Sequence, residues 1–319
     1  MSPPPALRLL FFGTPEFAVP SLRALVCSRH PVVGAISQPD RPRGRGRKLA
    51  PTPVKLEAQA HGLAVLQPEK VGESAALDWM RERAPELGVV VAFGQFIPRS
   101  VRELPPRGLI NAHASLLPRH RGAAPIAHSI LAGDRRTGIS VIRVVREMDA
   151  GEICGVRETE IDPEESAGAL AERLAELAAE ALLEAVDRIA EGSAEFRPQD
   201  PSGVTQAPKL GRDFGRIDWS EPRDRVLRRI RAATPWPGAD LELPRGQGRL
   251  RILQARAWSE APAPSAPGRI RIEGERLGVS AADGWIELLR VRKPGGRPLT
   301  AAEYLRGARV SADEEGGPA

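Results

Sequence analysis

Short apolar runs alternate with segments of helical periodicity as far as residue 191, and this alternation restricts the chain to few folds. Leu7–Phe12, Val32–Ile36 and Gly88–Phe93 are predicted as buried strands, because each is short, apolar and followed by a turn or a helical stretch. Strands that alternate with helices form βαβ units around a mostly parallel sheet. The sequence therefore predicts an α/β fold for this part of the chain.

The same pattern continues with three more strands and ends with one long helix. The strands are predicted at Gly108–His113, Gly138–Val145 and Ile153–Ile161. A helix rich in Ala, Leu and Glu is predicted at Ser166–Glu191, and Gly192–Arg212 has the Gly, Ser, Pro, Gln and Asp content of a linker. We therefore expect a first domain, a linker and a second domain at 1–193, 194–213 and 214–319.

The second domain is predicted to be a small β module. Its short β-like runs are broken by glycine and proline, as in small barrels, and lie at Asp240–Leu243, Gly248–Ala257, Gly268–Ile272, Gly278–Ser280 and Gly284–Val291. Pro222–Ala233 precedes them as a predicted helix that buries Val226, Leu227 and Ile230. Trp236 follows this helix and is predicted as a core or interdomain anchor.

The excess positive charge of the chain lies in its C-terminal third. The 319 residues include 46 Lys or Arg and 41 Asp or Glu, a net charge of +5. Residues 214–319 hold 19 basic and 14 acidic residues, so residues 1–213 hold 27 of each. This asymmetry is expected if the second domain contacts a polyanion. Only five basic residues are lysine, however, and such a bias toward arginine equally fits a bias of the genome.

Other features argue against several classes of protein. Nothing approaches the unbroken apolar length of a membrane span, and residues 1–12 lack the pattern of a signal peptide. Cys27 and Cys154 are far apart and belong to no metal-binding motif, so we expect reduced thiols in a cytosolic protein and no metal. Gly13-Thr14-Pro15 is not a GxGxxG motif, and no Walker A motif occurs, which argues against nucleotide binding.

Asn111, His113 and Asp149 are the candidate catalytic residues. Asn111 and His113 lie two residues apart at the C-terminal end of a predicted strand, so their side chains project from one face. Ligands of open α/β sheets bind at that end of the strands. An amide that donates to an oxyanion, an imidazole that moves protons and a carboxylate that sets its tautomer are what acyl transfer to an amine requires.

The sequence around these residues resembles the folate-dependent formyltransferases. The resemblance runs from about Leu7 to near Val291 and is specific in combination, resting on residues 12–18, 38–48, 90–94, 111–125 and 233–238. Phe93 departs from the family pattern, in which tyrosine is commoner. The resemblance implies a Rossmann-like first domain, an OB-like barrel as second domain, and no metal.

It also implies an activity and partners. By this resemblance, the chain would transfer the formyl group of 10-formyltetrahydrofolate to the amino group of methionyl initiator tRNA, as a monomer in the cytosol of a bacterium. Asn111 would donate a hydrogen bond to the formyl oxygen. His113 would assist proton transfer or stabilise the tetrahedral intermediate as an imidazolium, and Asp149 would hold and polarise the site.

Three groups of binding residues follow from the same resemblance. The folate group comprises Phe93, Gly94, Gln95, Ser115, Leu116, Leu117 and Pro118. The group that shapes the methionyl pocket comprises Gly13, Thr14 and Phe17, although Phe17 equally suits a buried staple at a helix start. A loop that enters the acceptor stem of the tRNA would contribute Arg41, Arg43, Arg45, Arg47 and Lys48, with Arg45 as the main contact.

Other functions share parts of this pattern. A formyltransferase that acts on a nucleotide sugar or a purine precursor would use the same three catalytic residues, but would not need the arginine-rich loop or the basic second domain. A formyltetrahydrofolate hydrolase would use water in place of the amine. A tRNA-binding protein with a vestigial transferase domain would be non-catalytic, and the intact set of catalytic residues argues against it.

Overall fold

The computed structural model describes residues 5–43, 48–243, 248–264 and 266–307. The chain divides into two compact units. The first comprises residues 1–125, 136–160 and 171–208, and the second comprises residues 126–135, 161–170 and 209–319. The first unit thus includes residues 194–208, most of the segment whose composition predicts a linker.

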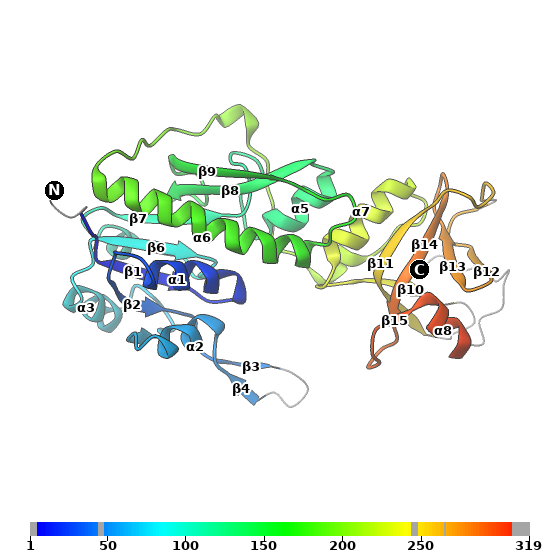
Figure 1. Ribbon diagram of the computed structural model, residues 1–319, viewed down its shortest axis with the longest axis horizontal. Coiled ribbons are helices and arrows are strands. Elements are labelled where there is room, and N and C mark those ends of the chain that lie inside the picture. Colours follow the sequence, from blue (N-terminus) through cyan, green and yellow to red (C-terminus); the bar gives the residue numbers. More distant parts are fainter. Residues whose placement is uncertain (1–4, 44–47, 244–247, 265, 308–319) are drawn as a thin grey trace. The chain divides into compact units, whose positions relative to one another are not determined.

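A seven-stranded sheet forms the centre of the first unit (Figure 1). Its first five strands are parallel, β8 is antiparallel to β7, and β9 is antiparallel to β8. In sheet order the strands are β5 (Val65–Leu66), β2 (Val32–Ile36), β1 (Leu9–Gly13), β6 (Leu87–Val91), β7 (Leu109–His113), β8 (Arg136–Arg143) and β9 (Ile153–Glu160). The predicted α/β class and mostly parallel sheet are confirmed.

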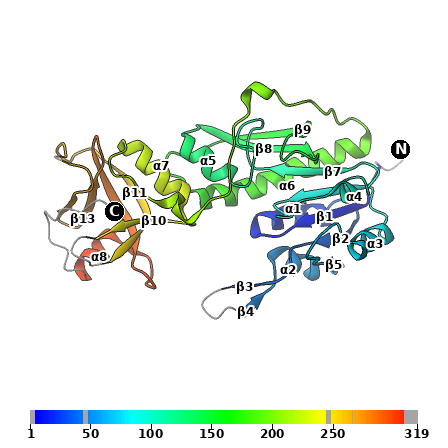
Figure 2. The same cartoon turned by 180° about the vertical axis from the view of Figure 1, so that it is seen from behind.

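Helices cover this sheet, with α1 and α6 on the face toward the viewer in Figure 1 and the opposite face turned forward in Figure 2. On α6, Leu174, Ala178, Leu182 and Val186 recur every four residues and are fully buried, which explains why this stretch forms one long amphipathic helix. In chain order the helices up to residue 191 are α1 (Val19–Val26), α2 (Pro53–Ala60), α3 (Ser74–Glu82), α4 (Arg99–Arg102), α5 (Pro125–Ala132) and α6 (Ala167–Glu191). All of α5 except Pro125, and the first turn of α6, belong to the second unit. Short 3-10 helices are η1 (Glu16–Ala18), η2 (Pro201–Gly203) and η3 (Arg212–Gly215). No helix among the described residues is long and apolar enough to cross a membrane.

The arginine-rich segment begins and ends as an antiparallel hairpin of β3 (Arg41–Arg43) and β4 (Lys48–Ala50). Its base is held by Asp40, whose two carboxylate oxygens accept hydrogen bonds of 2.6 Å from Gln67 Nε2 and Lys55 Nζ. The bonds from Gln67 and Lys55 lower the pKa of Asp40, because they stabilise the ionised carboxylate. The hairpin therefore leaves the domain from a fixed base.

The second unit contains a six-stranded antiparallel sheet in the order β10-β11-β14-β13-β12, with β15 paired to β14. Side chains from α7 (Arg223–Ala233) and the sheet fill its core, with Val226 and Ile230 buried and Leu227 partly so. The five predicted β runs match strands with ends displaced by two residues or fewer. The remaining elements are β10 (Ala239–Glu242), β11 (Arg249–Trp258), β12 (Ile270–Glu273), β13 (Arg276–Ser280), β14 (Trp285–Arg292), β15 (Leu299–Thr300) and α8 (Ala301–Gly307).

Trp236 is not part of this core, and of its two predicted roles that of a core anchor is wrong, because 56 % of it is exposed. It lies past the end of α7, whose buried face is already filled. The buried indoles are instead those of Trp258 and Trp285, on the paired strands β11 and β14. Gly278 makes room for Trp258, since a Cβ there would lie 2.7 Å from the indole ring.

Candidate active site

Strand β7 carries Asn111 and His113 at its C-terminal end, between β6 and β8. Asn111 is half-buried and His113 is buried. No hydrogen bond joins the Asn111 carboxamide to another residue in the part of the chain that the structure describes. Its amide protons are therefore available to a ligand at the edge of the sheet.

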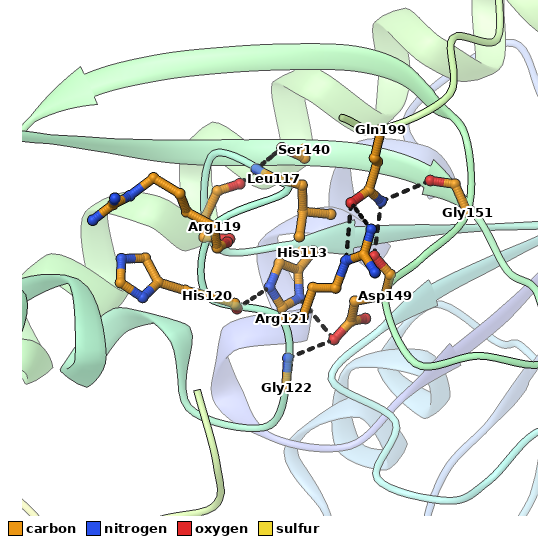
Figure 3. A network of polar contacts seen from close by, with 11 residues as sticks. His113, Leu117, Arg119, His120, Arg121, Gly122, Ser140, Asp149, Gly151 and Gln199 are labelled. Carbon is orange, nitrogen blue, oxygen red and sulfur yellow. Dashed lines mark hydrogen bonds and ion pairs between the residues drawn. The ribbon is translucent and has the colours of Figure 1, made fainter. Parts of the chain in front are cut away.

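The His113 imidazole lies between two hydrogen-bond acceptors (Figure 3). Its Nε2 donates to the carbonyl oxygen of His120 over 2.9 Å, and its Nδ1 lies 3.5 Å from Asp149 Oδ2. A neutral imidazole has one N–H and can donate to only one of them. The His113 ring is therefore held by the His120 carbonyl on one side and faces the Asp149 carboxylate on the other.

Asp149 is held in an unusual backbone conformation, with φ of 52° in the left-handed region. Aspartate visits this region more readily than most residues. Its Oδ2 accepts a hydrogen bond of 2.9 Å from the backbone N–H of Gly122, and 13 % of the side chain is exposed. Gly151, two residues on, lies so close to β8 that a Cβ there would be 1.8 Å from Arg143 O. The backbone on both sides of the carboxylate is therefore constrained.

A tight turn follows His113 and contains four residues predicted for folate binding. Ser140 Oγ donates to Ser115 O over 2.8 Å and accepts from Leu117 N over 3.0 Å, while Ser115 Oγ donates to Arg119 O over 2.7 Å. The Leu117–Pro118 peptide is cis. Ser115 is fully buried, so its hydroxyl supports the turn, and Leu116 in the same turn is half-buried.

Residues 194–208 contribute side chains to this network that sequence reasoning missed. Gln199 Nε2 donates to the carbonyl oxygens of Asp149 and Gly151 over 2.8 Å each, and Gln199 Oε1 accepts from Arg121 Nε and Nη2 over 3.0 and 2.7 Å (Figure 3). Thr205 Oγ1 accepts from the backbone N–H of His120 over 2.8 Å. These partners are 48 to 85 residues apart. Composition predicts a linker here because it carries no signal of partners so distant.

The other predicted folate residues lie beyond β6. Phe93 is buried and packs edge-on against Phe12, with 5.6 Å between ring centroids. Gln95 is used internally, since its Oε1 accepts from Val71 N and its Nε2 donates to Pro68 O. Gly94 is exposed with φ of 83°. Phe96, which sequence reasoning missed, is 71 % exposed and is the aromatic side chain of this loop open to a ligand.

The residues predicted for the methionyl pocket lie beside this loop. Thr14 Oγ1 donates to Phe93 O over 2.8 Å, so two of the predicted groups meet. Gly13 is buried at the end of β1, where a Cβ would be 2.9 Å from Ala18 Cβ, and Phe17 in η1 is half-buried. Among the described residues, no hydrogen bond joins this group to the network of His113 and Asp149.

The residues predicted for tRNA binding lie on the hairpin. Arg41 is exposed and its Nη2 is 3.9 Å from Glu69 Oε2, while Arg43 and Lys48 are paired across the two strands. Arg45 and Arg47 lie outside the described residues.

Two further features bear on ligands. No group of three or more His, Cys, Asp or Glu suited to a metal ion occurs among the residues that the structure places. A cavity of about 750 Å³ lies at the opposite end of β7, next to Gly108 and Leu109. Five arginines and one glutamate are among its lining residues, and none of the residues predicted for catalysis, folate or methionine lines it.

Comparison with known proteins identifies the family of the chain. The formyl transferase family matches residues 7–186, and the C-terminal domain of formyl transferases matches residues 209–309. The chain therefore belongs to the formyl transferase family.

Within the family, its relatives include enzymes of one kind. The methionyl-tRNA formyltransferase of Halorhodospira halophila (strain DSM 244 / SL1) is 43 % identical over 96 % of this chain and 97 % of its own length. That of Thermus thermophilus is 42 % identical over 96 % of this chain and 97 % of its own length.

Solved structures share the fold. WlaRD, a sugar 3N-formyl transferase, matches with a TM-score of 0.66 and 16 % identity over 88 % of this chain and 97 % of that one. HypX from Aquifex aeolicus matches with a TM-score of 0.61 and 20 % identity over 94 % of this chain. The chain spans about half the length of HypX, 48 % of it.

Proposed function

We propose that this protein transfers the formyl group of its co-substrate, 10-formyltetrahydrofolate, to the amino group of methionyl initiator tRNA. The observation that carries the proposal is the approach of His113 to Asp149, two residues after Asn111, in a chain 43 % identical to a methionyl-tRNA formyltransferase over nearly its full length. Asn111, His113 and Asp149 can each be assigned a role in this reaction.

The reaction forms one C–N bond and breaks another. The methionyl nitrogen attacks the formyl carbon, negative charge develops on the formyl oxygen, and the bond from carbon to N10 of the folate then breaks. One proton leaves the amine and one joins N10, so that formylmethionyl-tRNA and tetrahydrofolate result. The unbonded carboxamide of Asn111 donates to the developing oxyanion, a contribution that is typically about a hundredfold or more in rate.

His113 and Asp149 divide the remaining tasks. Because Nε2 of His113 is bonded to the His120 carbonyl and Nδ1 faces Asp149, the imidazole is held beside the reacting carbonyl, where it assists proton transfer or stabilises the tetrahedral intermediate. Asp149 Oδ2 contacts Gly122 and His113, whereas Oδ1 has no hydrogen-bond partner among the described residues. We assign Oδ1 as the atom that receives the amine proton.

The acceptor is recognised as an RNA as well as an amino acid. The arginine-rich hairpin has a fixed base at Asp40, and the net positive charge lies in residues 214–319. Cations of this kind contact a phosphate backbone. We place the enzyme, as a monomer, in the bacterial cytosol, where initiator tRNA is charged.

The experiment is transfer of labelled formyl from 10-formyltetrahydrofolate to methionyl initiator tRNA, methionyl elongator tRNA and free methionine. Rapid transfer to the initiator alone is expected. If none of the three acceptors is formylated while the folate still binds, the tRNA assignment fails, and a small amine becomes the acceptor to seek.

A further inference from the structure

We propose that Gln199 is a positioning residue that holds Asp149 against His113. Gln199 belongs to neither β7 nor the loop after β8, but its side chain lies between Arg121 and the loop that carries Asp149 (Figure 3). We name Gln199, the Arg121 guanidinium and the carbonyls of Asp149 and Gly151 the Gln199 brace. The inference rests on the proposed function, since Asp149 is placed there in the chemistry.

The orientation of the Gln199 amide follows from its neighbours. Arg121 can only donate, so the amide oxygen must face the guanidinium, from which it accepts two hydrogen bonds of 3.0 and 2.7 Å. Carbonyls can only accept, so the amide nitrogen must face Asp149 and Gly151, at 2.8 Å each. All four hydrogen-bonding positions of the amide are used, and a flipped amide would lose all four.

The loop that carries Asp149 requires stabilisation by its surroundings. A left-handed φ at a residue other than glycine costs on the order of 1 kcal/mol or more, and the structure around Asp149 must supply that energy. Gln199 fixes the carbonyls on both sides of Ala150, while Gly122 fixes the carboxylate from the other side. Without the amide donors, the backbone of Asp149 is free to leave the conformation that directs its carboxylate toward His113.

The segment that carries Gln199 is itself anchored on both sides of it. Arg197 exchanges two backbone hydrogen bonds with Ile153, at the start of β9, over 2.8 and 2.9 Å. Ala207 N donates to Arg121 O over 2.7 Å. A Cβ at Gly122 would lie 2.5 Å from Ala207 O, so the two backbones touch there. Gln199 thus acts from a rigid support and not from a free linker.

Gln199→Glu is the discriminating variant. A glutamate has nearly the same size and keeps Arg121 satisfied through an ion pair, but it places oxygen where two donors faced carbonyls. Gln199→Ala removes both sets of bonds. Gln206→Glu and Gln206→Ala are the matched controls, because Gln206 lies in the same segment and is exposed. Its side chain makes no hydrogen bond to another described residue.

For both Gln199 variants, kcat is expected to fall about a hundredfold, as it does when a catalytic group shifts by about 1 Å. KM for the folate and for the tRNA should stay within about twofold of the wild type, because no residue predicted to bind either substrate belongs to the brace. A residue that serves only stability would behave differently: both variants would have a lower melting temperature, while kcat of the folded enzyme well below that temperature would match the wild type. The Gln206 controls should match the wild type.

Hydrogen exchange gives a second readout that needs no turnover. The Gly122 amide donates to Asp149 Oδ2, so its exchange reports whether the carboxylate is in place. The amide is expected to exchange at least about tenfold faster in both Gln199 variants than in the Gln206 controls. Unchanged exchange in either Gln199 variant, or unchanged kcat, overturns the proposal. Faster exchange in a protein that formylates no tRNA would leave the brace intact and refute the proposed function instead.

Discussion

At the scale of single residues, Asn111 differs from its neighbours because its side chain makes no hydrogen bond to another described residue. His113, Ser115 and Asp149 are bound to other parts of the protein, whereas no described residue hydrogen-bonds the Asn111 carboxamide. Asn111→Ala is therefore expected to lower kcat by about a hundredfold or more. Its melting temperature should stay close to that of the wild type, as thermal unfolding beside the transfer assay would test. A fully active variant would remove Asn111 from the mechanism.

Gly151 is the residue whose enlargement should damage both the fold and the chemistry. A Cβ at 1.8 Å from Arg143 O cannot be accommodated unless the loop moves away from β8. For Gly151→Ala we expect a loss of about 1–3 kcal/mol in the free energy of unfolding, together with a loss of kcat, because Asp149 moves with the loop. Denaturant unfolding and kinetics measure the two effects. Gly211→Ala is the control, since a Cβ there meets nothing within 4 Å. Equal behaviour of the two variants would contradict the argument.

Sequence reasoning reached some residues of the site and not others. Asn111 and His113 could be paired because their spacing on a strand fixes a shared face. Asp149 could be named as a candidate carboxylate, but its approach to His113 had to come from the structure. Gln199 and Thr205 have partners 50 and 85 residues away, and nothing in the local sequence near them records those contacts.

At the scale of elements, strands and long helices were predicted well because their periodicity is local. The helix predicted at Ser166–Glu191 and the observed α6 differ by one residue, since an uninterrupted apolar stripe defines it. The arginine-rich loop proved to be a hairpin at its base, because cross-strand pairing and the bonds to Asp40 are tertiary features. The prediction that Trp236 packs in a core was wrong for a related reason, because the burial of a side chain depends on its tertiary neighbours.

Strand β14 carries a prediction of its own, at Glu287. This buried carboxylate lies 2.8 Å from Arg276 Nε and 2.8 Å from Arg256 Nε. Hydrogen bonds from Arg276 and then from Arg256 lower the pKa of Glu287, so its stabilisation is present above the ordinary glutamate pKa and is lost as the pH falls through the lowered value. Glu287→Gln should cost about 1–3 kcal/mol near neutral pH, because it leaves two arginines short of their acceptor.

Thermal unfolding between about pH 3 and pH 8 checks this sign, since the range crosses the ordinary glutamate pKa. The difference between the wild type and Glu287→Gln is expected to shrink toward the acid end. Glu275→Gln, on the exposed turn between β12 and β13, serves as the control. A difference that grew as the pH fell would show the assigned sign to be wrong.

At the scale of the whole molecule, the charge asymmetry dictates how the two substrates respond to salt. All of the net charge of +5 lies in residues 214–319, and tRNA binding is expected to release counterions. KM for the tRNA should therefore rise at least about tenfold between about 50 and 200 mM KCl, whereas KM for the folate should change little. Steady-state kinetics at several salt concentrations test this. Parallel responses of the two substrates would argue against an electrostatic role of the second domain.

The Gln199 brace also sets an order of events during synthesis. Every strand of the seven-stranded sheet has been made once a ribosome has passed Glu160. The amide that fixes Asp149 is encoded 50 residues after it, and the backbone contact of Ala207 with Arg121 later still. A nascent chain that ends at residue 193 therefore contains every predicted catalytic residue but lacks the part that holds one of them in place. A gene fragment cut at that point would yield a complete sheet with an unfinished site.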